Sequence, residues 1–335
     1  VVFTLSEPFG PFLGIFEVGS LPMIPKHIYA GTDYKTNPAN NTPIGTGPYM
    51  FKEWKKGSYI RLTKNPNYHV AGKPYLDEIY WHVIPDAAAR AVAFETGKVD
   101  ILPGGSVENF DVQRLSSLKG ACSTTKGWEF FSPHSWLWLN NRKGPTANKA
   151  FRQAVSYALD RDFARDVVWN GLGKPATGPF SSTVRYHDPK AAKYSYDPAK
   201  AKALLKEAGY KGEPVRLLPL PYGETWQRWA EAVKQNLEDA GIKVELVATD
   251  VAGWNQKTSD WDYDIAFTYL YQYGDPALGV GRNYVTSQIA KGSPFNNVEG
   301  YSNPSVDTAF AEGASAVGDD KRRPIYEAVQ KTLVE

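Results

Sequence analysis

Residues 214–247 constrain the fold more than any other part of this 335-residue chain. Two strand-like apolar runs, 214–220 and 242–247, flank a segment, 224–240, whose large apolar residues recur at helical spacing and which stops at Gly241. When a helix connects two strands of one sheet, the two strands run parallel to each other. The segment therefore predicts a βαβ unit and places the chain in the α/β class.

Other segments favour the same class. Asp86 is placed to cap a helix over 87–96, and a short strand is expected over 99–102. A strand over 136–140 precedes an amphipathic helix whose apolar stripe is expected to lie in the core. This stripe consists of Phe151, Val155, Leu159, Phe163 and Val167. The remaining expected elements are a helix over 199–208, a strand over 263–271 and helical segments from Pro304 and from Lys321.

Composition and charge exclude several classes of partner. The chain is 42% hydrophobic and 22% charged, as globular proteins are, and its 38 basic and 36 acidic residues leave a formal charge of only +2. This balance gives no electrostatic reason to expect nucleic acid or an anionic membrane surface. The single cysteine, Cys122, excludes an internal disulfide framework. The first residues read as the inside of a strand and the last as an unfinished helix, so we expect both ends to be cut from a longer protein.

Catalytic and metal-binding motifs are poorly represented. The sequence has no G-x-S-x-G or H-E-x-x-H motif, and its five histidines include no pair at one-turn spacing. Gly45 and Gly47 precede an expected strand rather than open a helix, so a turn is favoured over a phosphate loop. Neighbouring carboxylates are interpreted as solvated charge rather than as acid–base pairs. These are Asp260 with Asp262 and Asp319 with Asp320. No catalytic residue, cofactor or metal is therefore predicted.

Aromatic residues are the best candidates for a binding surface. The chain has 10 tryptophans, 20 tyrosines and 15 phenylalanines, with clusters at 136–138 and 269–273 where expected strands run into loops. Successive side chains of a strand point to opposite faces, so one aromatic row can stay exposed as a ligand wall beside a few polar anchors. The predicted walls are Trp136, Trp138, Tyr271 and Tyr273, and the predicted anchors are Asn140, Asn141, Asp275 and Arg282. Turn chemistry explains Asp275 equally well, because it precedes Pro276.

A series of motifs resembles one protein family. Residues 42–51 (TPIGTGPYMF), 65–68 (NPNY) and 72–77 (GKPYLD) combine a turn made rigid by glycine and proline with an aromatic-rich hairpin. The later matching segments are 85–90 (PDAAAR) with 97–100 (GKVD), 151–161 (FRQAVSYALDR), 196–210 (YDP to AGY) and 300–307, which begins GYSNP. In this order they cover nearly the whole chain, and together they resemble the family 5 extracellular solute-binding proteins of peptide-type ABC importers.

This resemblance implies a periplasmic-binding-protein-like architecture of type II (cluster C-like), in which two hinged α/β lobes contain mixed sheets. Residues 1–135 are expected to be an incomplete first lobe and residues 136–335 most of the second. The implied function is the substrate-binding component of an ABC importer, which captures a solute between its lobes and presents the closed form to permease subunits in the membrane. The protein is expected to be a monomer and not an enzyme. Its expected location is the periplasm, or the cell exterior as a membrane-tethered lipoprotein.

The resemblance leaves the solute open. In peptide-binding relatives an acidic residue two positions before the Gly-Asp-Pro element holds the amino terminus of the peptide, and here that position is Gln272, while Asp275 is the family-like aspartate. A neutral amide cannot provide the same charge-assisted hydrogen bond. Gln272 joins the expected site, and a peptide-like solute is favoured over an oligosaccharide or another small solute. The alternatives from other classes are a glycan hydrolase or esterase with aromatic subsites and a receptor that signals without transport.

Overall fold

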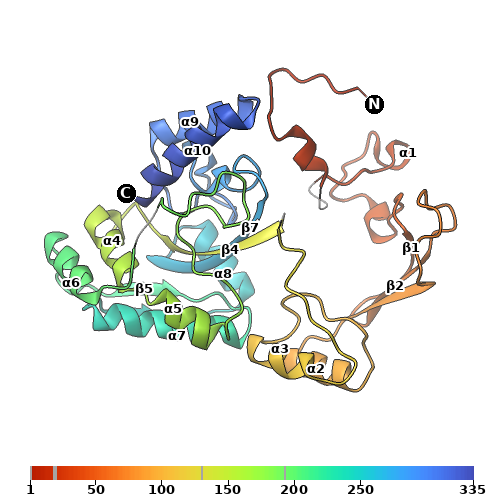
Figure 1. The fold of residues 1–335 in the computed structure, drawn as a ribbon, viewed down its shortest axis with the longest axis horizontal. Coiled ribbons are helices and arrows are strands. Elements are labelled where there is room, and N and C mark those ends of the chain that lie inside the picture. Colours follow the sequence, from red (N-terminus) through yellow and green to blue (C-terminus); the bar gives the residue numbers. More distant parts are fainter. Residues whose placement is uncertain (1, 18–20, 130, 192–193) are drawn as a thin grey trace. The chain divides into compact units, whose positions relative to one another are not determined.

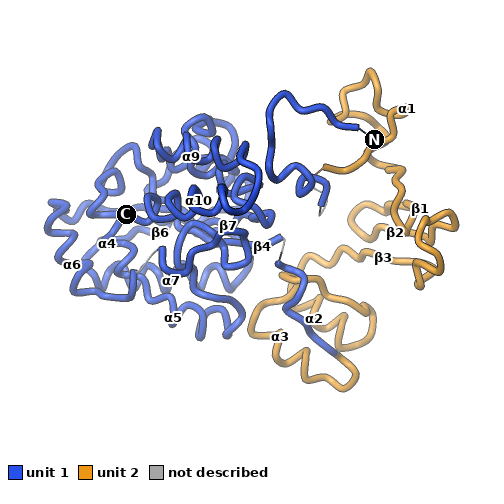
Figure 2. Tube along the Cα trace, turned by 45° about the horizontal axis from the view of Figure 1, so that its top comes forward, with its two compact units in different colours: residues 1–18, 122–335 blue, residues 19–121 orange. Residues whose placement is uncertain are grey.

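The computed structural model describes residues 2–17, 21–129, 131–191 and 194–335. The chain forms two compact units (Figure 2). Unit 1 combines residues 1–18 with residues 122–335, and unit 2 comprises residues 19–121. The lobe boundary expected after residue 135 falls inside a strand of unit 1, and the division into lobes stays a prediction.

Unit 2 contains a three-stranded antiparallel sheet. β1 (Tyr49–Lys55), β2 (Tyr59–Lys64) and β3 (Glu78–His82) follow one another in space as they do in sequence. The register of β1 against β2 shifts by one residue between Phe51 and Glu53, which marks a β-bulge. The alternating, aromatic-rich pattern of this region predicts a hairpin, and the structure confirms it.

The helices of unit 2 are short. They are α1 (Lys26–Tyr29), η2 (Pro38–Asn41), α2 (Ala87–Glu95) and α3 (Asn109–Ser116). Asp86 caps α2 as predicted, because its carboxylate accepts a 2.7 Å hydrogen bond from the backbone N–H of Ala89. The strand predicted over 99–102 is wrong: these residues are described and have no strand pairing, and the side chain of Ile101 is exposed.

Unit 1 contains a four-stranded mixed sheet in the order β4-β7-β5-β6. β4 (Phe131–Leu139) and β7 (Ile265–Tyr273) pair antiparallel over their whole lengths and lie side by side in Figure 1. β5 (Val215–Leu218) pairs in parallel with β7 and with β6 (Val244–Leu246). Because α7 (Glu224–Asp239) connects β5 to β6, the predicted βαβ unit and the α/β class are both confirmed.

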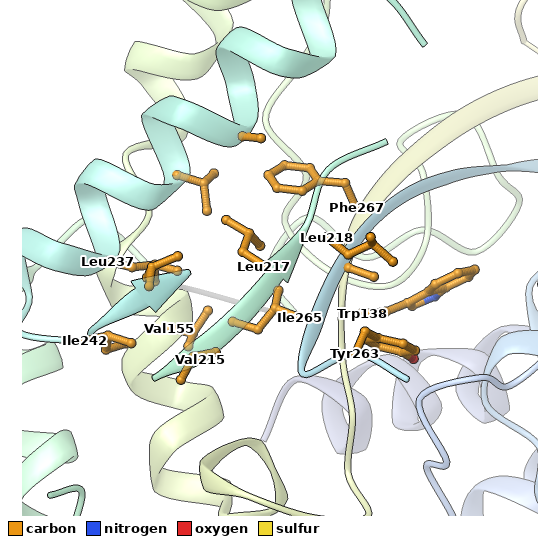
Figure 3. Close-up of a cluster of buried hydrophobic side chains, with 14 of the residues drawn as sticks. Trp138, Val155, Val215, Leu217, Leu218, Leu237, Ile242, Tyr263, Ile265 and Phe267 are labelled. Carbon is orange, nitrogen blue, oxygen red and sulfur yellow. The ribbon is translucent and has the colours of Figure 1, made fainter. Parts of the chain in front are cut away.

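The main core of unit 1 packs this sheet against helices. Figure 3 shows side chains of β5, β7 and α7 converging, among them Leu217, Phe267 and Leu237, which are completely buried. The other helices of this core are α4 (Lys149–Ala158), α6 (Pro198–Glu207) and α8 (Val251–Ser259). Close packing on this scale fixes the sheet, so side chains at the ends of its strands have defined positions.

The long helix predicted from Phe151 is divided in the structure. α4 ends because Leu159 adopts an extended backbone with ψ of 119°, and Asp160 then caps a new turn by accepting a 2.9 Å hydrogen bond from the N–H of residue 163. The chain continues as α5 (Arg161–Phe163) and the π-helical turn η4 (Ala164–Val168). A single helical stripe therefore cannot extend past the end of α4.

This break explains which residues of the predicted stripe reach the core. Phe151 and Val155 are buried as predicted, and Leu159 packs against the core from a partly exposed position. Phe163 and Val167 are 44% and 48% exposed, so their prediction as core residues was wrong. The spacing of four residues is correct for one helix, but the backbone changes direction at Leu159, where α4 ends.

A second, smaller core lies beneath the last two helices of unit 1. α9 (Pro304–Ser315) and α10 (Asp319–Val334) pack side by side (Figure 1), and they bury Phe310 and Tyr326 between them and a preceding loop. The remaining short elements of unit 1 are η1 (Phe12–Phe16), η3 (Pro145–Ala147), η5 (Gly281–Asn283) and η6 (Thr286–Gln288). Among the residues that the structure describes, no helix has the length and apolar character needed to cross a membrane.

Candidate ligand-binding site

One face of the β4–β7 pair carries a row of aromatic side chains at the end where β4 begins and β7 stops. Phe131 lies opposite Tyr273 in the register, and strand alternation places Tyr271 and Tyr269 on the same face. Trp128 joins the row from the segment that precedes β4. These five residues, Trp128, Phe131, Tyr269, Tyr271 and Tyr273, are called the aromatic strip below.

Along the aromatic strip, each ring contacts the next one. The Phe131 ring stacks on Tyr271 with centroids 3.9 Å apart and contacts Tyr273 at 5.2 Å, while Trp128 lies parallel to Tyr271 at 6.5 Å. Tyr269 meets Tyr271 edge-on at 5.6 Å. These are favourable aromatic geometries. Trp128 is 37% exposed and the other four rings are partly exposed, so the strip presents a continuous aromatic surface.

The inner end of the strip is anchored in the core. The Tyr269 ring stacks on Trp226 of α7 with centroids 5.6 Å apart, and Trp226 in turn contacts Trp229 and Trp169. Tyr222, which is exposed, meets Tyr269 edge-on. Burial raises the pKa of Tyr269 to about 12, so its hydroxyl stays neutral at physiological pH. The strip is therefore an extension of the core rather than a set of loose surface residues.

The outer end of the strip meets a loop that folds back on it. The N–H of Tyr273 donates to the carbonyl of Leu278 at 3.0 Å, and a Cβ atom on Gly279 would lie 2.7 Å from the Tyr273 ring. Gly279 also has a φ of +97°, so only glycine suits this position. Arg282 follows, and its Nε and Nη2 donate to the carbonyls of Gly279 (3.2 Å) and Tyr271 (3.5 Å). Burial lowers the pKa of this guanidinium.

Three predicted site residues on β4 and just after it lie away from the strip. Trp138 is 3% exposed and stacks on Trp254 in the core. Asn140 is buried and donates to two backbone carbonyls in residues 261–263 at 3.1 and 3.0 Å. Trp136 belongs to the same face as Trp138, and its indole N–H donates to a tyrosine hydroxyl at 3.1 Å. These side chains contact the protein itself in the structure, and their role in binding stays a prediction.

The two predicted anchors after Tyr271 also have partners within unit 1. Gln272 has no exposed surface; its Oε1 accepts from the N–H of Ser181 at 2.7 Å and its Nε2 donates to the carbonyl of Pro179 at 2.9 Å. Asp275 is buried and forms a two-point ion pair with Arg322 at 2.6 and 2.7 Å. Both side chains therefore hold loops and α10 in place, and neither belongs to the aromatic strip.

The ionisable groups outside the strip have structural explanations. Asp262 pairs with Arg216 at 2.6 Å and with Lys257 at 3.0 Å, and the hydrogen bond from Arg216 is the main reason that its pKa is lowered to about 2. Burial raises the pKa of Glu299 to about 8, but its carbonyl bonds to the N–H of Asn141, at the opposite end of the β4–β7 pair from the strip. In the described ranges no cluster of three or more His, Cys, Asp or Glu side chains is placed to hold a metal ion.

Some of the residues predicted from the sequence lie together at this strand end, and other members of the aromatic strip were not predicted. Tyr271, Tyr273 and Arg282 are brought together as expected, whereas Trp128 and Phe131 were not predicted. Phe131 is recognised as part of the strip only from the register that sets it opposite Tyr273, and Trp128 only from its stacking on Tyr271. Both contacts join segments that are far apart in the sequence. No local pattern shows that pairing, so these residues could not be assigned before the fold was known.

The described geometry is a mixed α/β sheet with a partly exposed aromatic strip at the end where β4 begins and β7 stops. The chain belongs to the bacterial extracellular solute-binding proteins, family 5, because the model of the middle region of that family matches residues 1–291. The type II periplasmic-binding-protein fold and the family resemblance predicted from the sequence are thereby confirmed.

Individual relatives agree with this assignment. The chain is 28% identical to the probable D,D-dipeptide-binding periplasmic protein DdpA of Escherichia coli K12, over 100% of this chain and 64% of that protein. It is 27% identical to the glutathione-binding protein GsiB of Pectobacterium atrosepticum, over 99% of this chain and 64% of the relative. The chain thus spans 64% of the length of each of these curated relatives.

Solved structures show the same fold. The periplasmic binding protein DppA of Helicobacter pylori, in complex with the peptide STSA, matches with a TM-score of 0.82 and 25% identity, over 99% of this chain and 64% of that one. The binding protein AgaA of Agrobacterium tumefaciens R10, in complex with agropinic acid, matches with a TM-score of 0.79 and 28% identity, over 99% of this chain and 66% of that one. The relatives therefore bind solutes of more than one kind.

Proposed function

We propose that this chain is part of the substrate-binding component of an ABC importer, which captures a peptide-like solute and delivers it to permease subunits in a membrane. The observation that carries the proposal is the aromatic strip, a partly exposed stacking surface that is continuous with the core. Membership of the family supports it, as do relatives whose names state dipeptide or glutathione binding. We further propose that the protein acts as a monomer and that it is located in the periplasm; the name of the E. coli relative supports the location.

The strip is suited to hold a solute by stacking and burial. An aromatic contact contributes about 0.5–1.5 kcal/mol beyond the area that it buries. A micromolar affinity requires about 8 kcal/mol, so the strip needs to act together with apolar burial and a few polar contacts. Because Tyr269 is already packed on Trp226, little side-chain freedom remains to be lost when a solute binds.

We also propose that the solute is bound without chemical change. The two carboxyl groups with strongly shifted pKa values are explained by the fold: Asp262 by its ion pairs and Glu299 by its burial at the opposite end of the β4–β7 pair. Neither group contacts the aromatic strip through a described hydrogen bond. A glycoside hydrolase would typically need a pair of carboxyl groups on either side of the bond that it cleaves.

The proposal is tested with the full-length protein. Native mass spectrometry of gently purified protein should show a bound solute of defined mass, and calorimetry with a panel of di- and tripeptides should show binding. Tyr271→Ala and Tyr273→Ala should each weaken that binding roughly tenfold, because each change removes one stacking surface. Tyr196→Ala is the matched control, since this tyrosine is exposed and lies outside the strip. No binding of any peptide, or equal affinity in all three variants, would contradict the proposal.

A further inference from the structure

We propose that the solute presents a carboxylate to Arg282, which makes this residue the anion anchor at the outer end of the aromatic strip. The inference rests on the proposed function and adds the charge of the solute. Its basis is the position of a partly buried cation beside Tyr273, where the acceptors that the guanidinium contacts are uncharged.

Within the described residues, the hydrogen bonds of Arg282 go to uncharged acceptors. A guanidinium has five N–H donors in a fixed planar fork. Here Nε donates to the carbonyl of Gly279 at 3.2 Å, and Nη2 donates to the carbonyl of Tyr271 at 3.5 Å, which is the outer limit for a hydrogen bond. Neither acceptor carries a charge. A carboxylate is the partner that the remaining donors fit best, because it accepts two parallel hydrogen bonds from the fork.

The place of Arg282 distinguishes it from other arginines that donate to backbone carbonyls. Arg152 and Arg161 do so as well, but their acceptors lie in the 146–147 loop and at residues 156, 159 and 194, away from the aromatic strip. Arg282 instead lies against the carbonyl of Tyr271 and next to Tyr273, two members of the strip. A solute that stacks on these rings comes within reach of the guanidinium.

The acidic and amide groups that could attract an amine at this end already bind the protein. Asp275 is paired with Arg322 in the interior, and both ends of the Gln272 amide are bonded to the 179–181 segment. Glu129, which lies between two residues of the strip in sequence, accepts a 2.7 Å hydrogen bond from the N–H of Gly127. Glu129 is exposed, so solvent screens its charge, whereas the partly buried Arg282 has only uncharged acceptors in the described hydrogen bonds and favours an acid over an amine.

The geometry also indicates the part of the solute that lies next to the carboxylate. Arg282 donates to the backbone carbonyl of Tyr271, whose ring stacks on Phe131, and Phe131 also contacts Tyr273. A carboxylate on Arg282 places the adjoining atoms of the solute on these rings. An apolar or planar group in that position gains from stacking. For a peptide, this describes the carboxyl-terminal residue with an apolar or aromatic side chain.

The test compares acids with their amides on the full-length protein. The probes are alanyl-phenylalanine, alanyl-phenylalanyl-alanine and D-alanyl-D-alanine, each as the free acid and as the carboxyl-terminal amide, with affinities measured by calorimetry. The wild-type protein should bind at least one acid roughly 10- to 100-fold more tightly than its amide, as expected for a charge-assisted hydrogen bond. In Arg282→Gln this ratio should fall to about one, because the amide of glutamine can still donate to a carbonyl but carries no charge.

Two further variants keep the result interpretable. Arg282→Lys retains the charge without the fork, so part of the acid preference should remain. Arg323→Gln, at an exposed arginine on α10 paired only loosely with Glu327 at 3.9 Å, removes the same charge elsewhere and should leave the ratio unchanged. Equal affinities for acid and amide in the wild type, or an acid preference that survives in Arg282→Gln, would overturn this inference while the proposed function stands. Failure to bind any of the six probes, while other peptides of the panel bind, would also overturn the inference, whereas failure of the whole panel would contradict the proposed function.

Discussion

At the end where β4 begins and β7 stops, the two faces of the β4–β7 pair differ in exposure and in chemistry, although Phe267 and Ile265 farther along the strip face are buried. One face carries the aromatic strip, whose rings are partly exposed and contact mainly one another. The opposite face carries Trp138, His134 and Gln272, which are buried and contact other parts of unit 1. We call these three residues the buried row. A difference of one position along a strand thus separates residues that can meet a solute from residues that hold the fold.

This contrast changes the meaning of a polar residue near a binding surface. Gln272 lies between two tyrosines of the strip in sequence, but its amide is used to fasten the 179–181 segment to β7. Asp275 follows in the next loop and fixes α10 through Arg322. Substitutions in these residues should therefore change stability first, whereas substitutions in the strip should change affinity first. The predictions below test that separation.

The largest effect is expected at the ion pair of Asp275. Asp275→Asn leaves the buried guanidinium of Arg322 without a negative partner, and such a loss costs about 3–5 kcal/mol of unfolding free energy. Urea denaturation of the full-length protein, followed by circular dichroism, measures this change. If Asp275 were instead a solute anchor, the variant would bind weakly and remain as stable as the wild type.

A surface ion pair provides the control for this measurement. Asp162 pairs with Arg165 at 2.8 Å, and its side chain is 76% exposed. Asp162→Asn removes the same charge from an exposed pair whose arginine also binds Asp166 at 2.6 Å, so the loss of stability should be much smaller than at Asp275, because solvent screens the interaction and Arg165 keeps one partner. If both variants lost the same unfolding free energy, burial would not explain the contribution of the Asp275 ion pair to stability.

His134 gives the buried row a dependence on pH. Burial, with a smaller contribution from nearby His187, lowers the pKa of His134 to about 4 from an ordinary value of 6.5. Between these two values the unfolded chain binds a proton that the folded chain does not, so the stability falls as the solution is acidified. The loss amounts to about 3 kcal/mol over the whole interval.

The contribution of His134 is isolated by comparing how the unfolding free energy changes with pH in a variant and in the wild type, rather than by comparing the two stabilities at one pH. His134→Phe keeps a planar ring beside Trp136, whose ring lies 4.6 Å from that of His134, and removes the proton-binding site. The unfolding free energy of this variant should change less between pH 4 and pH 6.5 than that of the wild type, as measured by urea denaturation across that range. Parallel curves for the two proteins would assign the acid sensitivity to other groups.

The sequence predicts the elements of unit 1 well because their signals are local. The βαβ unit around α7 follows from apolar spacing and from the glycine after the helix, and the structure confirms it. The exposed positions of Phe163 and Val167 do not follow from spacing, since the extended backbone at Leu159 interrupts a periodic stripe. The spacing of apolar residues predicts which of them share one face of a continuous helix, but it does not predict where the helix ends.

The site is less predictable than the fold because it depends on pairing between distant segments. Tyr271 and Tyr273 stand out as aromatic residues at a strand end, but Phe131 becomes their neighbour only through the register of β4 against β7. The partners of Gln272 and Asp275 come from the 179–181 segment and from α10, which no motif near β7 indicates. Sequence patterns therefore indicated this strand end without separating the face of the aromatic strip from the buried face.

The smallest and sharpest test uses two adjacent residues on opposite faces of β7. Gln272→Leu leaves the buried N–H of Ser181 and the carbonyl of Pro179 without partners, and it should cost about 1–3 kcal/mol of unfolding free energy. Tyr271→Ala removes a partly exposed ring and should cost less stability, while it weakens the binding of peptides roughly tenfold. Urea denaturation and calorimetry on both variants of the full-length protein give two numbers for each residue. If the two faces have separate roles, Gln272→Leu should lose mainly stability and Tyr271→Ala mainly affinity. A Gln272 variant that loses affinity with unchanged stability would assign this residue to the binding face.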